Sequence, residues 1–492
     1  MKTVTKWGLR PWGLGLAALG VAALTAHPAL AQTPSGAVAT TTGPVPAAAV
    51  NKGDTAWMLV STLLVLMMAV PGLALFYGGL VRTKNMLSVL TQTLMIVCMA
   101  ALLWITFGYS LAFTGGNAVV GGLSKAFLMG VDANSQAATF SNGVYIPEYV
   151  YIAFQMTFAC ITPALFIGSV AERVRFSPLM LFVALWLTLV YFPIAHMVWY
   201  WGGPDAVAAA ALKGASALAA QNADAGFLFQ KGALDFAGGT VVHINAGIAG
   251  LVMCVILGKR AGYPREPMPP HSLTMTMIGA SLLWVGWFGF NAGSNLEANG
   301  VTGVAFLNTF VATAAAGLSW VLVEQIARGK PSLLGAASGV VAGLVAVTPA
   351  AGFAGPMGSI VLGLIVSPIC FFFVSAVKAR FGYDDSLDVF GVHCIGGITG
   401  AILTGVLDAP YLGGQGIADY SAKPGTLVAG SYGMAAQVWI QLQGVIVTLA
   451  WSSIGGTVLF VAIDRLWGMR PSVEVEHEGL DIAEHGERAY HY

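Results

Sequence analysis

The chain has 492 residues, of which 57% are hydrophobic and only 9% are charged, and its mean hydropathy is +0.77. Soluble domains carry about 25% charged residues, so this composition excludes a soluble globular protein and indicates a helical protein that crosses a membrane many times. The formal net charge is zero and gives no indication of a nucleic-acid partner. The five cysteines lie in apolar segments without CxxC spacing, so we expect small buried thiols, with neither a disulfide framework nor a metal site.

Residues 1–31 have the pattern of a secretory signal peptide. Lys2, Lys6 and Arg10 give a basic start, residues 12–26 are apolar, and the small residues at 29–31 offer a cleavage site. An uncleaved first membrane helix is the alternative, but the apolar run is short and the linker at 32–52, rich in Thr, Pro and Ala, is not membrane-like. We therefore predict a cleaved signal peptide, a membrane domain at 53–467 and a C-terminal tail at 468–492.

Eleven apolar runs of helical length follow the linker. They lie at about residues 55–79, 86–113, 148–171, 178–199, 236–258, 273–294, 303–326, 332–350, 357–377, 389–407 and 438–466. Short loops on one side of these spans carry 13 Lys and Arg residues, whereas the other side carries 4, namely Lys125, Lys213, Lys231 and Lys423. The positive-inside rule then predicts a mature N-terminus outside the cell and a C-terminus inside it.

One sequence pattern occurs in both the fifth and the tenth span. His243 is followed by Gly247, Ile248 and Gly250, and His393 is followed at the same spacing by Gly397, Ile398 and Gly400. A period of five spans gives corresponding helices opposite orientations, which predicts an inverted repeat of spans 1–5 and 6–10 with a site between the halves. A chance match is one alternative, and close helix contacts at the glycines are another that is compatible with the repeat.

Polar and aromatic residues fall at one end of several spans. Asp235 opens the fifth span and suits a helix N-terminus, and His243 lies eight residues later, about 12 Å deeper. Span four ends at Trp199, and span six reaches Ser294 at the same side. We expect these groups to converge at one outer mouth, where an aromatic ring attracts a small cation by about 0.5–2 kcal/mol. An interfacial aromatic belt is the plainer interpretation of the tryptophan.

Three phenylalanines are expected beneath that mouth. Phe154 and Phe158 lie a little below the surface in span three, and Phe290 lies one turn before the end of span six. Taken singly, each is more typical of core packing than of a gate.

The interiors of the spans carry few ionisable groups, namely Asp235, His243, Asp388, His393 and, near an inner end, Glu324. A hydrated ion pore needs rings of charges or carbonyls, and a charge at the middle of an apolar wall costs roughly 2.5–3.5 kcal/mol or more. The species that crosses the middle is therefore expected to be small, polar and neutral. Histidine can accept or pass a proton near neutral pH, and a coupled pair resists double protonation.

Several longer motifs resemble the conserved blocks of the Amt/Mep/Rh ammonium transporter family, in its bacterial Amt branch. They are residues 71–79 (PGLALFYGG), 171–176 (AERVRF), 235–250 (DFAGGTVVHINAGIAG), 286–294 (GWFGFNAGS), 329–335 (GKPSLLG) and 388–393 (DVFGVH). The resemblance covers about residues 53–490, and the motifs agree in order. It implies an all-α, polytopic membrane protein in the inner (plasma) membrane, without a cofactor and without enzymatic activity.

The resemblance also implies roles for individual residues. Trp199, Phe158, Ser294 and Phe154 would form the recruitment site, and Phe158 and Phe290 would form the gate. His243 and His393 would line the pore and relay protons. Asp235 would support the structure of the recruitment site. The tail at 479–490 also looks like the family tail. It implies a PII-type regulatory partner in the cytoplasm, and the family further implies a homotrimer in the lipid bilayer with one conduit per subunit.

The function so implied is ammonium uptake. NH4+ would be bound outside and deprotonated, NH3 would pass the twin histidines, and a proton relay would make net transport electrogenic; methylammonium is a further expected substrate. A passive NH3 gas channel is the alternative mechanism, and an ammonium sensor with little transport is the alternative class. A metalloenzyme built on His243, His393 and Cys394 is disfavoured, because adjacent residues on one helix point apart and no third convergent ligand is evident.

Overall fold

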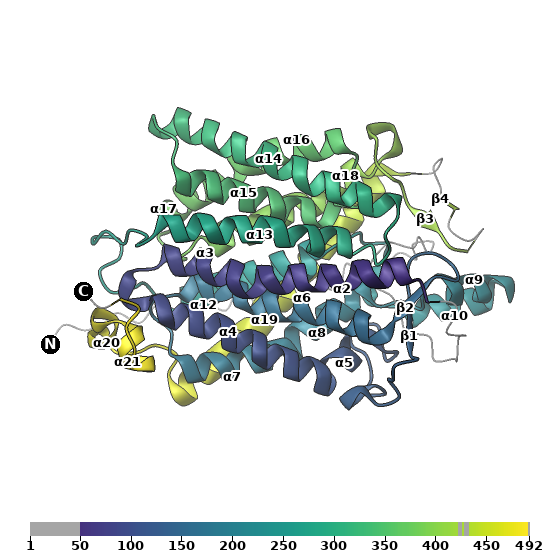
Figure 1. Cartoon of the computed structure of the whole chain (residues 1–492), viewed down its shortest axis with the longest axis horizontal. Coiled ribbons are helices and arrows are strands. Elements are labelled where there is room, and N and C mark those ends of the chain that lie inside the picture. Colours follow the sequence, from purple (N-terminus) through teal and green to yellow (C-terminus); the bar gives the residue numbers. More distant parts are fainter. Residues whose placement is uncertain (1–49, 422–425, 428–431, 491–492) are drawn as a thin grey trace, which may run out of the picture.

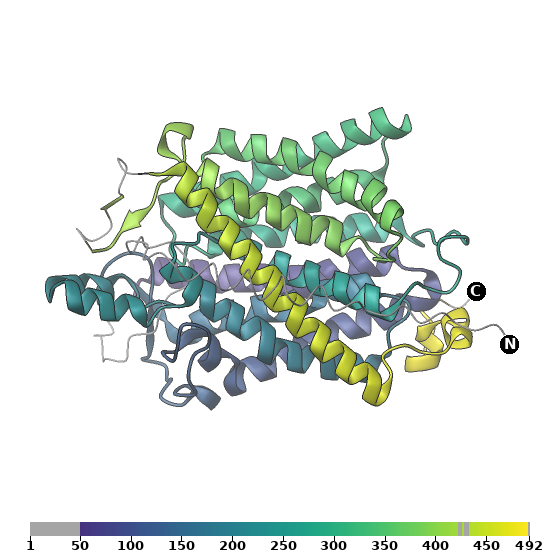
Figure 2. The ribbon, with the colours of Figure 1, turned by 180° about the vertical axis from the view of Figure 1, so that it is seen from behind.

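The computed structural model describes residues 50–421, 426–427 and 432–490. Within these residues, eleven helices are long and apolar enough to cross a membrane, which confirms the number predicted from the apolar runs. The signal peptide and most of the linker lie outside the described residues, so their predicted processing stays a prediction. Figure 1 shows the helices lying side by side along the longest dimension of the molecule, and Figure 2 shows the last one, α19 (Met434–Trp467), crossing the back of the bundle obliquely.

Most spans consist of an α-helix with a short π or 3₁₀ turn at one point. In chain order they are α2 (Lys52–Met67), η3 (Met68–Gly72) and α3 (Leu73–Leu80); η4 (Thr83–Asn85), α4 (Met86–Leu103), η5 (Trp104–Gly108) and α5 (Tyr109–Phe113); α6 (Glu148–Val170); α7 (Phe176–Trp186), η7 (Leu187–Tyr191) and α8 (Phe192–Trp199); η8 (Gly239–Ile244) and α12 (Asn245–Leu257); α13 (Leu273–Gly293); α14 (Gly300–Arg328); α15 (Leu333–Val347) and η9 (Thr348–Ala350); α16 (Pro356–Phe372), η10 (Phe373–Val377) and α17 (Lys378–Phe381); η11 (Phe390–Cys394) and α18 (Ile395–Leu407); and α19.

The segments that connect the spans lie at the two opposite ends of the molecule (Figure 1). One end, called here the Trp199 face, carries η6 (Ala126–Leu128), the antiparallel pair β1 (Gln136–Ala138) and β2 (Tyr145–Pro147), α9 (Pro204–Leu212), α10 (Ala215–Ala223), α11 (Phe227–Gln230), η12 (Pro410–Leu412) and the antiparallel pair β3 (Ala418–Asp419) and β4 (Thr426–Leu427). The other end, the tail face, carries α20 (Val473–Glu478) and α21 (Leu480–His485).

Spans five and ten both begin inside the molecule. Each starts with a π turn, η8 or η11, that contains its histidine, and the two histidine rings touch. Consecutive crossings alternate in direction, so spans five and ten run in opposite directions. Because their histidines touch, the two helices start at a similar depth and run away from each other. Span five starts at residue 239 and not at the predicted 236, because Gly238 has a φ of 110° that no helix accommodates.

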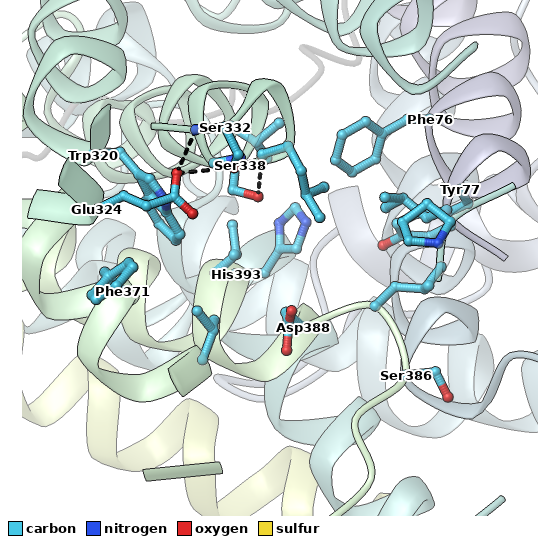
Figure 3. A pocket seen from close by; sticks show the side chains of 18 of the residues that line it. Phe76, Tyr77, Trp320, Glu324, Ser332, Ser338, Phe371, Ser386, Asp388 and His393 are labelled. Carbon is cyan, nitrogen blue, oxygen red and sulfur yellow. Dashed lines mark hydrogen bonds between the residues drawn. The ribbon is translucent and has the colours of Figure 1, made fainter. Parts of the chain in front are cut away.

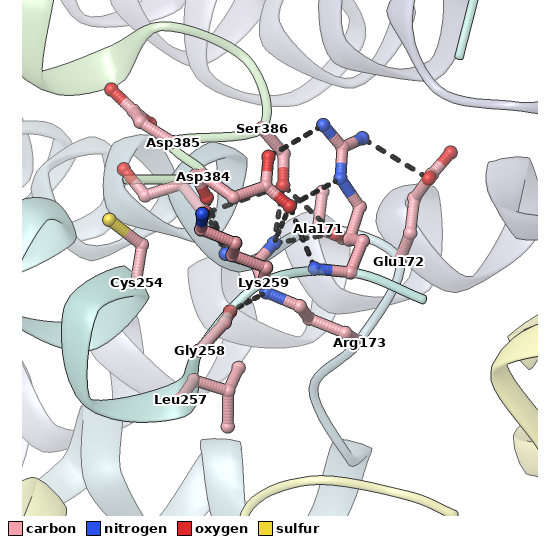
Figure 4. A network of polar contacts seen from close by, with 12 residues as sticks. Ala171, Glu172, Arg173, Cys254, Leu257, Gly258, Lys259, Asp384, Asp385 and Ser386 are labelled. Atoms are coloured by element: carbon pink, nitrogen blue, oxygen red, sulfur yellow. Dashed lines mark hydrogen bonds and ion pairs between the residues drawn. The ribbon is translucent and has the colours of Figure 1, made fainter. Parts of the chain in front are cut away.

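A network of buried charges joins the tail-face ends of four spans (Figure 4). Glu172 accepts hydrogen bonds from Arg82 and Arg260, and Asp384 accepts from the Arg260 backbone and guanidinium at 2.8–2.9 Å. Arg173 donates to the carbonyl of Asp384. Burial alone raises the pKa of Glu172, but the guanidiniums of Arg260 and Arg82 outweigh burial and hold this pKa below its usual value. Both acids therefore remain charged and hold the ends of these helices together.

The tail docks on the tail face next to the start of span two. The Asp481 carboxylate accepts hydrogen bonds from the backbone amides of Leu87 and Ser88 at 3.0 and 2.8 Å, which otherwise lack partners in the first turn of α4. Lys84 Nζ donates to the carbonyl of Glu476 at 2.9 Å. The tail thus supplies the cap of a membrane-spanning helix.

The cysteines depart from the prediction at one position. All five are free, and four of them are buried. Cys98 is exposed on the side of α4, where it lines an apolar groove, because the apolar surroundings that suggested burial are here the lipid-facing surface.

Candidate functional site

Asp235 holds the start of span five and the ring of Trp199 in place. Its carboxylate accepts hydrogen bonds from the amides of residues 238–241, at 2.5–3.2 Å, and from the hydroxyl of Thr240. Its backbone carbonyl accepts from Trp199 Nε1 at 2.9 Å. Because the carboxylate is buried and its oxygens are occupied by these donors, it has no position from which to bind a cation directly.

Trp199 and three phenylalanine rings form one aromatic cluster. The rings of Phe158 and Phe290 stack with centroids 4.2 Å apart and an interplanar angle of 25°. The ring of Trp199 meets Phe158 edge-on at 5.7 Å, and Phe154 lies 5.1 Å from Phe158. All four side chains are buried, so the cluster is packed into the interior of the protein.

Ser294 lies one helical turn beyond the stacked pair, at the C-cap of α13. Its hydroxyl donates to the Phe290 carbonyl at 2.7 Å, and the side chain is partly exposed. In the described part of the chain, no hydrogen bond joins it to Trp199. The serine hydroxyl is thus held on its own helix, by the carbonyl one turn before it.

The two histidines meet directly below the stacked phenylalanines. His243 Nδ1 and His393 Nδ1 are 3.3 Å apart, and the ring centroids are 5.4 Å apart. On its other side His243 stacks on Trp287 at 5.4 Å, and Trp287 Nε1 donates to Thr348 Oγ1 at 2.9 Å. The sequence analysis assigned no role to Trp287; its spacing of three residues from Phe290 along span six was the available signal.

The glycines of the repeated pattern allow this contact. A Cβ at Gly247 would lie 2.4 Å from the backbone nitrogen of Cys394, the residue after His393. A Cβ at Gly397 would lie 3.2 Å from the Cβ of His243. Each glycine thus faces the histidine segment of the other helix, so close helix contact and a shared site are both present.

A cavity of about 260 Å³ leads from the tail face to His393 (Figure 3). Two acids in its wall already have partners: Glu324 accepts from the amide and hydroxyl of Ser332, and Asp388 pairs with Lys378 at 2.7 Å. The large rings in the wall, which the sequence analysis did not identify, are Phe76, Tyr77, Trp320 and Phe371.

Together these features define a class: a multi-pass membrane protein in which a stacked aromatic pair lies next to two buried imidazoles, one of which, His393, borders a cavity. A model described as the Ammonium Transporter Family matches residues 56–490. The ammonium transporter of Bacillus subtilis is 43% identical over 441 residues, which cover 89% of this chain and 98% of that protein. The chain belongs to the ammonium transporter family, and the family consists of transporters and not of enzymes.

Solved structures share the fold. Saccharomyces cerevisiae Mep2 superimposes with a TM-score of 0.74 at 31% identity, covering 88% of this chain and 94% of that one. A sensor Amt protein superimposes with a TM-score of 0.75 at 25% identity, covering 88% and 98%.

Proposed function

We propose that this protein recruits ammonium at the Trp199 face, deprotonates it at the gate of Phe158 and Phe290, and conducts ammonia past His243 and His393. The observation that carries the proposal is the buried imidazole pair, 3.3 Å apart, which lies next to Phe290 and whose second member, His393, borders the tail-face cavity. Methylammonium, which differs by one methyl group, is a further proposed substrate.

Recruitment rests on neutral groups. The faces of Trp199 and Phe158 attract a cation through their quadrupoles, and the lone pairs of the Ser294 hydroxyl accept a hydrogen bond from it. Asp235 acts as a support, because its oxygens are occupied by backbone amides. A site without a free carboxylate binds ammonium weakly enough to release it.

The conduit favours the neutral form of the substrate. The rings around the histidines are apolar, so a charge there would lose its hydration without compensation. Of two neutral imidazoles in contact through Nδ1, one donates N–H and the other accepts it. Nε2 of His243 has no hydrogen-bond partner in the described chain and is therefore available to the substrate.

The same contact offers a path for the proton. An imidazole that accepts a proton at Nε2 can release the proton at Nδ1 to its neighbour, whose Nε2 then releases one toward the cavity. One charge would cross for each ammonium taken up, which makes transport electrogenic. A passive ammonia channel uses the same conduit without the relay.

Currents on a solid-supported membrane test the proposal. An ammonium pulse on proteoliposomes is expected to give a current in the wild type and none in the double variant His243→Ala, His393→Ala. His271→Ala, a histidine away from the path, serves as the control and is expected to keep its current. Ammonia flux without current in the wild type would establish the passive channel, and unchanged methylammonium flux in the double variant would exclude the relay.

The likeness to a sensor Amt protein favours a second candidate function, an ammonium sensor with little transport. Such a protein would show an ammonium-dependent rise in thermal stability, because the ligand binds only the folded state, yet give neither current nor flux.

Further proposals concern the assembly and its setting. We place the chain in the inner membrane as a homotrimer, with the membrane domain at 53–467, the Trp199 face outside and the tail at 468–492 in the cytoplasm. The 13 to 4 distribution of Lys and Arg supports this orientation. A PII-type protein is the proposed cytoplasmic partner, and the position of the docked tail on the face where the cavity opens supports it.

A further inference from the structure

The loop between spans two and three turns back along the helix that it has just left. Past the end of α5 at Phe113, the amide of Gly121 donates to the carbonyl of Leu111 at 2.7 Å, and the amide of Lys125 donates to Ser110 Oγ at 3.0 Å. The next turn, η6, contacts η5, which ends five residues before the end of the span. At about 1.5 Å per residue, η6 therefore lies roughly 10 Å below the end of the helix. In Figure 1 this segment runs beside α5 at the lower edge of the bundle.

The tip of this loop presents large apolar side chains to its surroundings. Leu123, Phe127 and Met129 are 59%, 74% and 56% exposed. Phe127 and Leu128 both have a φ of 55°, a left-handed conformation that bulky side chains rarely adopt. Two strained residues in succession, beside three exposed apolar side chains, are unfavourable for a loop surrounded by water.

Most backbone amides of residues 121–131, in contrast, donate hydrogen bonds within the protein. The amides of residues 126, 128, 129 and 131 donate to carbonyls within the same loop at 3.0–3.1 Å. Lys125 is buried and pairs with Glu148, which also accepts from Tyr109 at 2.7 Å, and the hydroxyl of Tyr149 donates to the Val131 carbonyl. Hydrocarbon tolerates irregular backbone only when its polar groups are paired in this way.

The neighbouring surface of span two is also apolar and exposed. Leu94 and Leu102 are exposed on α4, in the same span as η5. An apolar groove of about 490 Å³ between α4 and α7 reaches Thr106 in η5, the segment that η6 contacts. The apolar tip of the loop thus continues the exposed apolar surface of a membrane-spanning helix.

We propose that residues 121–131 form a re-entrant loop that is embedded in the membrane leaflet at the Trp199 face, where Leu123, Phe127 and Met129 contact lipid acyl chains. The occupant of this surface is phospholipid. The loop also anchors the start of span three, because the partner of Lys125 is the first residue of α6.

Nitroxide accessibility tests this placement. In a Cys98→Ser background, which removes the exposed native thiol, a spin label is attached to Phe127→Cys and, separately, to Met129→Cys. The full chain is reconstituted in liposomes of phosphatidylethanolamine and phosphatidylglycerol. Collisions with oxygen, which partitions into lipid, are compared with collisions with a water-soluble nickel chelate.

Two reference sites calibrate the measurement. Leu102→Cys lies on the lipid-facing side of span two, and Leu212→Cys lies on the 91% exposed end of α9 at the Trp199 face. Both loop labels are expected to collide with oxygen as often as the Leu102 label does. Their collisions with the nickel chelate are expected to be much less frequent than those of the Leu212 label. Nickel accessibility equal to that of the Leu212 label would overturn the proposal, because the loop would then face water. Protection from both reagents would also overturn it, because the tip would then lie against protein.

Discussion

The position of His243 is set by side chains from three other spans. Trp287 of α13 stacks on the imidazole at 5.4 Å, Nδ1 of His393 in η11 lies 3.3 Å from the Nδ1 of His243, and the ring of Phe290 lies 6.0 Å away. Trp287 is in turn fixed by its hydrogen bond to Thr348, at the end of span eight. A ring held by stacking on Trp287 keeps its Nδ1 directed at His393, which the proposed relay requires.

A second buried ionisable group, Asp408, lies just past α18 on the Trp199 face. It is fully buried, and neither carboxylate oxygen has a hydrogen-bond partner in the described chain. The Gly416 amide beside it donates to the backbone carbonyl of Asp408 at 3.0 Å. Burial raises the pKa of this carboxyl to about 8, against a smaller opposing effect of the Gly416 amide.

We predict that Asp408→Asn stabilises the protein at alkaline pH. The pKa of Asp408 in the folded state lies above the unfolded value of 3.8. Below about pH 4 the carboxyl is protonated in both states, so its burial causes no pH-dependent loss of stability. Stability then falls by about 1.4 kcal/mol for each pH unit between the two pKa values. The amide does not ionise and avoids this loss, so its melting temperature is expected to exceed that of the wild type at pH 8 and to equal it near pH 4.5. Equal shifts at both pH values would contradict the prediction.

The sequence identifies some of these residues and not others, for physical reasons. His243, His393 and Asp235 stand out because ionisable groups are rare in apolar spans. Trp287 does not stand out, because a tryptophan in an apolar helix has the same pattern whether it packs in the core or faces a path. Asp408 follows the last apolar residue of a span, where an exposed carboxylate is ordinary, and only the return of the glycine-rich loop over it causes its burial.

At the scale of elements, the long apolar runs were sufficient to predict every span. The structure of the segments between the spans could not be predicted from them. The π turns at η8 and η11 depend on Gly238 and on contacts between the two helices, which no linear pattern contains. The tail had the composition of a polar segment, yet it caps α4 through Asp481.

The α9–α10 hairpin is a further element that the apolar runs did not indicate. It projects from the Trp199 face in Figure 1, and its base is closed by a 2.9 Å hydrogen bond from the Gly226 amide to the Tyr200 carbonyl. Asp205 of α9 fastens it to the β1–β2 loop through Gly143 and Tyr145. A small separate core of Trp201, Val207, Ala225, Phe229 and Tyr420 holds it in place.

We predict that the hairpin can be removed without loss of transport. Because the chain leaves and returns at one hydrogen-bonded pair, replacing residues 202–224 by two glycines leaves Trp199 and Asp235 in place. The ammonium current is expected to stay near that of the wild type. The melting temperature is expected to fall, because burial of Val207, about 1.5–3 kcal/mol, is lost.

The control for this deletion is Val207→Ser, which keeps the hairpin but weakens its core. It is expected to lower the melting temperature without changing the current. Loss of current in a folded deletion variant would show that the hairpin takes part in recruitment.

At the scale of the whole molecule, the two end faces differ in charge and in construction. The tail face is held by the buried ion pairs of Arg82, Glu172, Arg260 and Asp384 and by the docked tail. The Trp199 face is built from short strands, the α9–α10 hairpin and loops that carry few Lys and Arg residues. This asymmetry matches the distribution of Lys and Arg along the sequence and gives the proposed orientation a structural counterpart.

We predict that a membrane-impermeant maleimide added to intact cells labels Leu212→Cys but not Glu487→Cys. Leu212 is exposed at the tip of the hairpin on the Trp199 face, and Glu487 is exposed at the tail face, so both thiols are accessible to water on their own side. Wild-type protein measures the background, since four native cysteines are buried and Cys98 faces the apolar groove. Permeabilised cells supply the second control: Glu487→Cys is expected to become labelled there, which shows that its thiol is reactive. Labelling of Glu487→Cys in intact cells, with Leu212→Cys protected until permeabilisation, would reverse the orientation and direct the proposed recruitment site to the cytoplasm.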